Sequence, residues 1–193
     1  MDLINGSIDP VNKVLWDEAK ADRAAGGFTL DSAVLSAVAY VLKGAALAVN
    51  YTTRVAKVVK SATVITGGSA TATRISKGSA FKVGDVISEA VGAIAVAITV
   101  IDTTNAAYDV LTHLSTSSAF TAGNVIFEAD AVGATSAYLL SANALLSDNT
   151  SITSTGSATV TAIIGALEIQ EANLPYPISA VSKTALTNRF QFV

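Results

Sequence analysis

The sequence predicts a mainly β protein, a β-barrel or β-sandwich, with an N-terminal helical arm and a short helix and strand at the C-terminus. Short runs rich in Val, Ile and Thr alternate with turn residues at a spacing of about 8–12 residues, which is typical of sandwiches and barrels. One turn-containing segment is written twice, which indicates repeated architecture. Charged residues make up only 14% of the chain and hydrophobic residues 51%, which fits either an obligate assembly or an ordinary β domain rich in small residues.

The first 27 residues carry much of the charge, so we divide the chain into an arm, residues 1–27, and a β-rich domain, residues 28–193. Asp9 and Pro10 start a helix in the arm, because Asp caps free N–H groups and Pro fits the first turn. The arm holds the only Trp, Trp16. Two interpretations stay open: Trp16 packs on its own domain, or it anchors the arm on a neighbouring subunit, since Trp is enriched at interface hot spots.

A second short helix is predicted over residues 31–42, with Asp31 as its cap. Strands are then predicted from the β-branched runs that lie between turn signals. The tail breaks at two prolines and is expected to form a short helix and a final extended strand. The predicted strands are "AALAVNY", "TTRVAKVV", "SATVIT", "ATATRIS", "VGAIAVAITVID", "AAYDVLTHLS", "NVIFEA", "SAYLLSA", "TSITST", "ATVTAIIGALEIQ" and the terminal "RFQFV".

The duplicated segment reads "GSAFKVGDVISEA" over residues 78–90 and "SSAFTAGNVIFEA" over residues 117–129, with eight of thirteen positions identical. A partial third copy, "KGAALAV" over residues 43–49, matches "KGSAFKV" over residues 77–83. The pattern predicts a β-corner closed by a large apolar plug: Gly supplies a positive φ, and Asp or Asn supplies local hydrogen bonds. The turn and plug residues are Gly44, Leu47, Gly78, Phe81, Gly84, Asp85, Phe120, Gly123 and Asn124.

The pattern of reactive side chains predicts no catalytic residue, cofactor or metal ion. The single histidine, His113, is expected to be exposed or at a strand edge, apart from Asp109. Glu89 and Glu128 are the only candidates for a glycosidase-type pair, and their equivalent places in the repeat favour a solvent or turn-capping role. Calcium would need more oxygen ligands than the loops around Asp102, Asp109 or Asp148-Asn149 offer.

Bulk composition argues against several classes of protein. The net charge of −3 offers no basic stripe for nucleic acid. The longest uncharged apolar runs, residues 33–42 and 91–101, fall short of the roughly 18–20 residues that span a bilayer as a helix. No cysteine is present, which excludes thiolate chemistry and disulfides. We expect a soluble protein without an export signal.

Five stretches between residues 40 and 187 resemble proteins of tailed bacteriophage heads: "LKGAALAVNYTT", "VVKSATVIT", "ISKGSAFKVGDVI", "ITVIDTTNAAYDVLT" and "NLPYPISAVSKTAL". They are similar to decoration, auxiliary capsid and head-fibre proteins, in particular those of crAss-like phages. The resemblance implies a β-barrel or sandwich that binds the outer surface of an assembled capsid, often as a trimer. It implies the major capsid protein and further copies of the chain as partners, and a place on the virion exterior after assembly in the host bacterial cytoplasm.

The leading hypothesis is therefore a non-enzymatic structural protein that stabilises a phage head. The alternative is a head-fibre base or an adhesin-type module that binds a receptor or glycan. Exposed aromatic side chains would favour the alternative, and the tyrosines available for it are Tyr51, Tyr108, Tyr138 and Tyr176.

Overall fold

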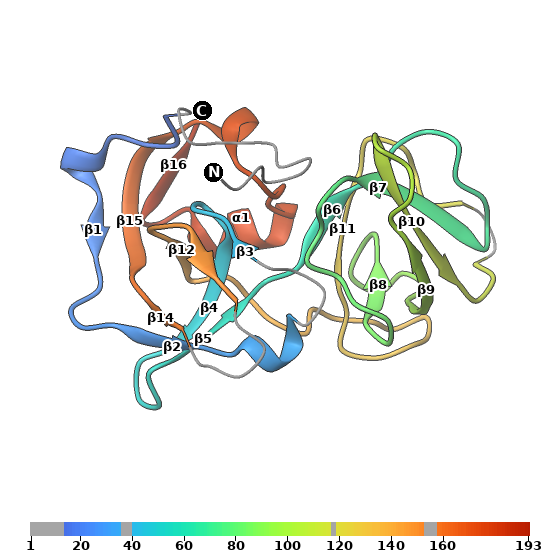
Figure 1. Cartoon of the computed structure of the whole chain (residues 1–193), viewed down its shortest axis with the longest axis horizontal. Coiled ribbons are helices and arrows are strands. Elements are labelled where there is room, and N and C mark those ends of the chain that lie inside the picture. Colours follow the sequence, from blue (N-terminus) through green and yellow to red (C-terminus); the bar gives the residue numbers. More distant parts are fainter. Residues whose placement is uncertain (1–13, 36–39, 117–118, 153–157) are drawn as a thin grey trace, which may run out of the picture.

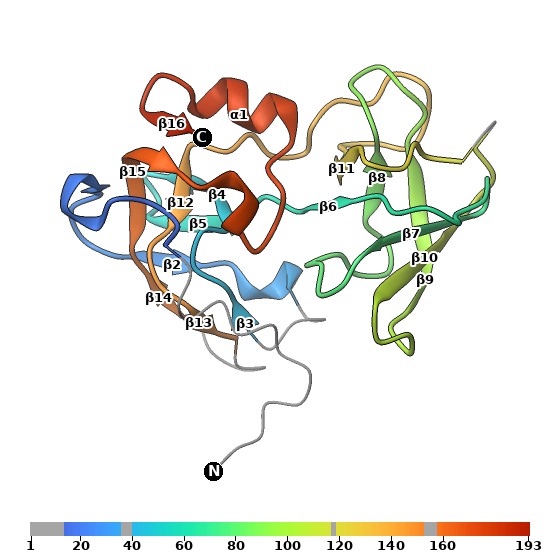
Figure 2. The same cartoon turned by 90° about the horizontal axis from the view of Figure 1, so that it is seen from above.

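The computed structural model describes residues 14–35, 40–116, 119–152 and 158–193. The chain forms two β lobes that lie side by side (Figure 1). A terminal lobe contains both ends of the described chain, and a barrel lobe is inserted between its strands β5 and β12. The insertion begins where residues 59–61 leave the terminal lobe and ends where residues 139–143 return to it, and Figure 2 shows both crossings. The expectation of a mainly β fold is confirmed.

The terminal lobe is built on an eight-stranded sheet with the order β1-β15-β12-β4-β5-β2-β14, and β16 pairs with β15 in parallel. A two-stranded sheet, β3 with β13, lies beside it. The strands are β1 (Asp22–Arg23), β2 (Phe28–Leu30), β3 (Tyr40–Val41), β4 (Ala46–Asn50), β5 (Val55–Val58), β12 (Ala144–Leu146), β13 (Thr150–Ser151), β14 (Thr159–Val160), β15 (Ala162–Ile169) and β16 (Phe190–Phe192).

Both faces of the large sheet are buried, because its central strands carry apolar residues at successive positions. In β4, Leu47 points into one core and Ala46 into the other. In β12, Leu146 and Leu145 divide in the same way. The second core is covered by helix α1 (Ala180–Leu186) and β16, which places the C-terminal segment against the sheet as Figure 2 shows.

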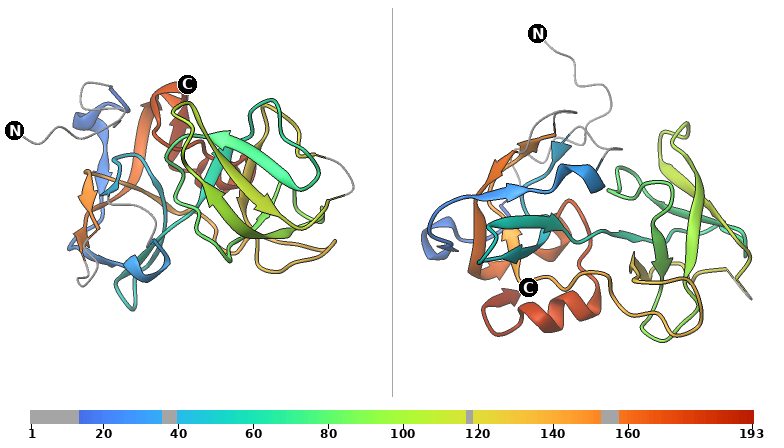
Figure 3. Two further views of the ribbon diagram at one scale, coloured as in Figure 1. Left: turned by 45° about the vertical axis from the view of Figure 1, so that its right-hand side comes forward. Right: turned by 90° about the horizontal axis from the view of Figure 1, so that it is seen from below.

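The barrel lobe is a six-stranded sheet with the order β6-β11-β8-β9-β10-β7. Its two ends meet through a bridge between Val64 and Ile75, and the Ile65 amide donates to the Arg74 carbonyl at 2.9 Å. The sheet is therefore closed, and its apolar interior is continuous. Its strands are β6 (Ser61–Thr63), β7 (Ala72–Ser76), β8 (Val86–Ser88), β9 (Val96–Asp102), β10 (Tyr108–His113) and β11 (Val125–Glu128), and Figure 3 shows the lobe from two further sides.

The barrel consists of two equivalent three-strand units, β6-β7-β8 and β9-β10-β11. Strand β8 pairs antiparallel with its equivalent β11, and β7 pairs antiparallel with its equivalent β10. The pairs β6 with β11 and β9 with β8 are equivalent to each other, and so are the pair β9 with β10 and the closure of β6 on β7. Such pairing relates the two units by a local two-fold axis, and each copy of the duplicated segment supplies the corner and last strand of one unit.

The helices predicted near the N-terminus are wrong within the described residues. Only a short 3-10 helix, Glu18–Lys20, forms after Asp17, whose side chain caps it. The chain then turns extended as β1, because Asp22 and Arg23 pair with β15. Of the predicted helix over residues 31–42, the described residues form a 3-10 turn, Ser32–Val34, and strand β3; residues 36–39 lie outside the described residues. Residues 1–13, with the predicted helix start, lie outside the described residues.

The C-terminal prediction is confirmed by α1 and β16. Ser179 caps α1 by accepting the Ser182 amide at 3.3 Å, and Pro177 precedes the helix. One predicted strand, "SAYLLSA", is wrong: residues 136–142 are irregular apart from a single bridge between Ala129 and Tyr138, and the strand β12 begins later. In the described part of the chain, no helix combines the length and apolar character needed to cross a membrane.

Candidate functional site

The duplicated segment forms two corners with the same backbone hydrogen bonds. Gly84 and Gly123 have φ of +94° and +91°, as the turn prediction requires. The Gly84 amide donates to Ile98 at 2.9 Å, and the Gly123 amide donates to Val64 at 2.8 Å. The two corners therefore have the same backbone geometry, and each corner joins the strand that begins the other unit.

Each corner faces a glutamate that belongs to the other copy of the repeat. The Glu89 carboxylate, from the first copy, accepts the Thr121 amide at 2.9 Å and an Asn124 side-chain hydrogen bond in the second corner. Glu128, from the second copy, lies near Asp85 of the first corner. The Asp85 carboxylate accepts a hydrogen bond from the Lys82 amide of the same corner, at 2.8 Å. The exchange of glutamates follows from the antiparallel pairing of β8 with β11.

The two corners differ in charge, and a buried lysine compensates the difference. Asp85 stands where the second corner has Asn124, so Asp85 and Glu128 are two carboxylates at one place. The Lys60 ammonium lies between them, 2.6 Å from Asp85 and 3.2 Å from Glu128. The side chains of Lys60, Asp85 and Glu128 are 1%, 4% and 12% exposed. This buried triad lies where the chain passes between the lobes, and the adjacent Ser61 hydroxyl donates to the Pro177 carbonyl of the terminal lobe.

Burial raises the pKa of the Glu128 carboxyl above its ordinary value. The positive charge of Lys60 opposes this rise, and the negative charge of Asp85 adds to it. The cause is physical: one ammonium cannot fully compensate two carboxylates removed from water. Glu128 therefore holds its proton at higher pH than an exposed glutamate does.

A cleft with a volume of about 540 Å³ lies between the lobes, next to the second corner. The barrel contributes Glu89, Asn124 and the aromatic pair Phe127 and Tyr138 to its walls. The terminal lobe contributes the beginning of α1 and the ion pair between Lys183 and Glu171. The cleft is therefore lined by polar groups that already hold one another, by aliphatic side chains and by one partly exposed aromatic ring.

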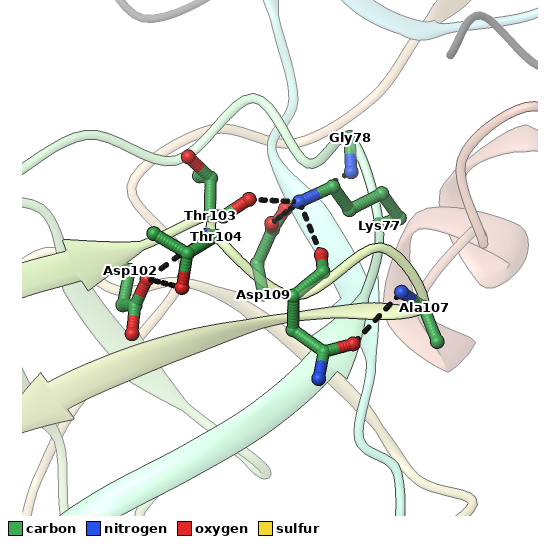
Figure 4. A network of polar contacts seen from close by, with 8 residues as sticks. Lys77, Gly78, Asp102, Thr103, Thr104, Ala107 and Asp109 are labelled. Atoms are coloured by element: carbon green, nitrogen blue, oxygen red, sulfur yellow. Dashed lines mark hydrogen bonds and ion pairs between the residues drawn. The ribbon is translucent and has the colours of Figure 1, made fainter.

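The two predicted residues of the hairpin strand β10 do not contact each other. Asp109 is buried, accepts the Lys77 ammonium at 2.7 Å and accepts the Gly78 amide at 3.0 Å. The Lys77 ammonium also donates to the carbonyls of Thr103 and Asn105, at 2.6 and 2.9 Å, so that it ties the β9–β10 turn to Gly78 (Figure 4). This network is structural, since Asp109 is only 4% exposed and the Lys77 ammonium joins it to two backbone carbonyls.

The expectation that His113 is exposed or at a strand edge is wrong. His113 is 4% exposed, and β10 lies between β9 and β7. Its Nε2 is 2.8 Å from the Thr73 hydroxyl, and its Nδ1 is 2.8 Å from the Leu114 carbonyl. A carbonyl only accepts, so Nδ1 carries a proton and Nε2 accepts from Thr73 in the neutral ring. Both nitrogens are used within the fold.

The structure buries the predicted plugs, but in two different lobes. Phe81 is 1% exposed inside the barrel, and Phe120 packs partly buried against the same interior and against the His113 ring. Leu47 is fully buried in strand β4 of the terminal lobe. The partial third copy thus shares only a turn: Gly44 and Gly78 have φ of +88° and +82°.

Trp16 lies in the core of its own chain, 2% exposed, which agrees with the first of the two interpretations of the arm. The Lys43 ammonium lies 4.9 Å from the centre of its ring. Leu15 packs beside it and contacts the region of Gly44, where an added Cβ would lie 2.9 Å from Leu15 Cδ1. Residues 14–27 are therefore part of the terminal lobe.

Sequence reasoning did not single out Lys60 or the cleft. A lysine inside the β-branched run "RVAKVVKSATVI" is the available signal, because a lysine at a core position of a strand needs a buried partner. The cleft has no local signal, since its walls come from residues 89–91, 123–138 and 171–183. Among the described residues, no three His, Asp or Glu side chains gather as metal ligands.

Comparison with protein-family models, with characterised proteins and with solved structures gives no significant match.

Proposed function

We propose that this chain is a non-enzymatic structural protein of a phage virion, which binds the outer surface of the capsid and stabilises it. The proposal rests on the resemblance of residues 40–187 to phage head proteins. It is supported by a surface feature of the barrel. Its partners would be the major capsid protein and further copies of the chain.

The supporting feature is an uncharged apolar tip formed by two crossing loops, residues 90–95 and 131–137. The loops hold each other through the bridge between Ala95 and Gly133 and through the Gly92 amide, which donates to Ser136 at 2.8 Å. Val91, Ile94 and Val132 project from them with exposures of 55%, 40% and 56%. A rigid apolar tip fits a protein surface better than water, because exposed apolar area favours association and rigid loops lose little entropy on binding.

The two loops of this tip follow the equivalent strands β8 and β11, and both contain "AVGA", at residues 90–93 and 131–134. Because β8 and β11 are antiparallel, the loops leave the pair at opposite ends. They meet where Ala95, directly before β9, forms a bridge with Gly133. Attachment through such a small area is weak for one copy, and several copies on a lattice multiply it through effective concentration.

Cosedimentation with emptied heads of a phage that encodes the chain tests the proposal. The chain should sediment with the heads and raise the temperature at which they break. Val91→Asp with Val132→Asp should lower head binding by at least about tenfold, since a charge must then be desolvated. Val100→Asp, at a similarly exposed valine in β9, is the matched control and should bind normally. A chain that neither binds heads nor changes their heat resistance contradicts the proposal.

A further inference from the structure

We propose that the cleft between the lobes binds a neutral saccharide unit, with the Tyr138 ring as its apolar platform and the surrounding carboxylates as acceptors for its hydroxyl groups. This second binding activity does not depend on attachment to a capsid. The volume of about 540 Å³ lies in the range of small-molecule sites, which occur preferentially between domains.

The platform is a braced aromatic pair. The ring of Phe127, a buried residue of β11, lies 4.3 Å from the ring of Tyr138 at a tilt of 39°. Tyr138 itself forms an isolated bridge with Ala129, which holds its backbone beside the residue that follows β11. Its side chain stays partly exposed in the cleft, and its hydroxyl makes no hydrogen bond with any residue in the described part of the chain. A sugar ring presents an apolar C–H face that can cover such a ring.

The polar groups around the platform are held in place before any ligand arrives. Glu89 is fixed by the Thr121 amide and by Asn124, and Glu171 is fixed by Lys183. Each carboxylate oxygen has two lone pairs, so each can accept a further hydrogen bond from a hydroxyl group. Preorganised acceptors reduce the entropy lost on binding. The cleft therefore offers several oriented acceptors and one free phenol.

The charges of the cleft select a neutral ligand. An anion would meet Glu89 on the barrel wall and Glu171 on the terminal-lobe wall, and a cation would meet the Lys183 ammonium, which is paired with Glu171 on that same wall. A compound with many hydroxyl donors satisfies the carboxylates without burying another charge, which would be costly. Hydroxyl donors on one edge and an apolar C–H face on the other are the defining features of a saccharide.

Saturation-transfer NMR with the full chain tests the inference. The probes are glucose, galactose, mannose, N-acetylglucosamine and lactose, each at about 10 mM, which suffices to detect millimolar dissociation constants. At least one sugar should give a saturation-transfer signal, and this signal should be strongest at the protons of the sugar ring. Tyr138→Ala should weaken its binding by at least about tenfold, as expected for an aromatic anchor, and Tyr138→Phe by a few-fold. Tyr40→Ala, at a tyrosine that is 50% exposed outside the cleft, is the matched control and should bind like the unchanged chain.

Ala180→Trp gives a second test that leaves the aromatic pair intact. Ala180 is an exposed residue of α1 that lines the cleft, so a large side chain there should block binding while far-UV circular dichroism stays unchanged. Absence of any sugar signal overturns the inference, and so does a signal that survives both Tyr138→Ala and Ala180→Trp. A saturation-transfer signal from acetyl-arginine amide, with none from any sugar, would overturn the inference and identify a cationic ligand instead. The sugar assay contains no capsid, so head binding and sugar binding can fail separately.

Discussion

Replacing Lys60 by Met tests the buried triad most directly. Met keeps most of the volume and the apolar stem of the lysine but removes the ammonium. The lysine is 1% exposed and lies 2.6 Å from Asp85 and 3.2 Å from Glu128, so its loss leaves two buried carboxylates without a cation. Breaking a buried ion pair by removing one partner costs about 3–5 kcal/mol, because the remaining charge stays desolvated. We expect Lys60→Met to lose about this much of its free energy of unfolding at pH 7.

The loss should depend on pH in a defined direction. Without Lys60, nothing opposes the burial and the Asp85 charge that raise the pKa of Glu128 in the folded state. A carboxyl with a raised folded pKa binds its proton more tightly when folded, so stability is present at low pH and falls as pH rises through the raised value. The difference in free energy of unfolding between Lys60→Met and the unchanged chain should therefore be largest at neutral pH and should become smaller toward about pH 4.5.

Urea unfolding followed by far-UV circular dichroism at several pH values measures this difference. Trp16 fluorescence, which reports the terminal lobe alone, shows in parallel whether the barrel unfolds first. Lys57→Met is the matched control: Lys57 is 45% exposed and lies 3.6 Å from Asp31, so its loss should cost about 0–1 kcal/mol. A Lys60→Met chain within about 1 kcal/mol of the unchanged chain at pH 7, or a loss that does not vary with pH, would refute the reasoning.

Three further predictions concern the barrel. The raised pKa of Glu128 makes the folded chain less stable as pH rises above about 4.5, and Glu128→Gln should abolish this decline. Gln still accepts a hydrogen bond from Lys60 but does not titrate, so an unchanged pH dependence in urea unfolding would contradict the prediction. Phe81→Ala should cost about 3–5 kcal/mol of unfolding free energy, since it empties the barrel interior, whereas Val83→Ala, at 57% exposure, should change it by less than about 0.5 kcal/mol. Gly84→Ala should cost about 1–2 kcal/mol through its φ of +94° alone, because an added Cβ meets no atom within 4 Å; a neutral result in thermal unfolding would show that the corner relaxes.

Much of the fold could be predicted where the signal is local. The positive φ at Gly84 and Gly123 follows from the turn chemistry of the repeat, and the strand and helix of the tail follow from Pro177 and the capping Ser179. The N-terminal helix was predicted from Asp9 and Pro10, and it is wrong over the described residues, where Leu15 and Trp16 are buried side by side and Val14 is 69% exposed. Pairing of Asp22 and Arg23 with β15 outweighs the helical preference of this short segment.

The candidate site could be predicted only in part. The repeat identified both corners, and the equivalence of Glu89 and Glu128 favoured a capping role, which the structure shows for Glu89. The burial of His113 was missed because its partner Thr73 lies forty residues away and carries no distinctive pattern. The cleft was missed because its walls come from two lobes, and Tyr138 has no neighbour in sequence that marks it as a platform.

The sequence by itself determined that this is a mainly β chain in which one type of β-corner occurs twice. Turns and strand alternation depend on neighbouring residues, so both can be recognised in the sequence. Only the tertiary structure decided that the two corners are halves of one closed barrel and that each receives the glutamate of the other. It also decided that Lys60 is buried between Asp85 and Glu128. The physical reason is that β-strands pair through backbone groups common to all residues. The sequence of an apolar, β-branched strand therefore does not specify which other strand it pairs with. Which strand meets which is set by closing the barrel and filling its interior, and those contacts join residues far apart in the chain.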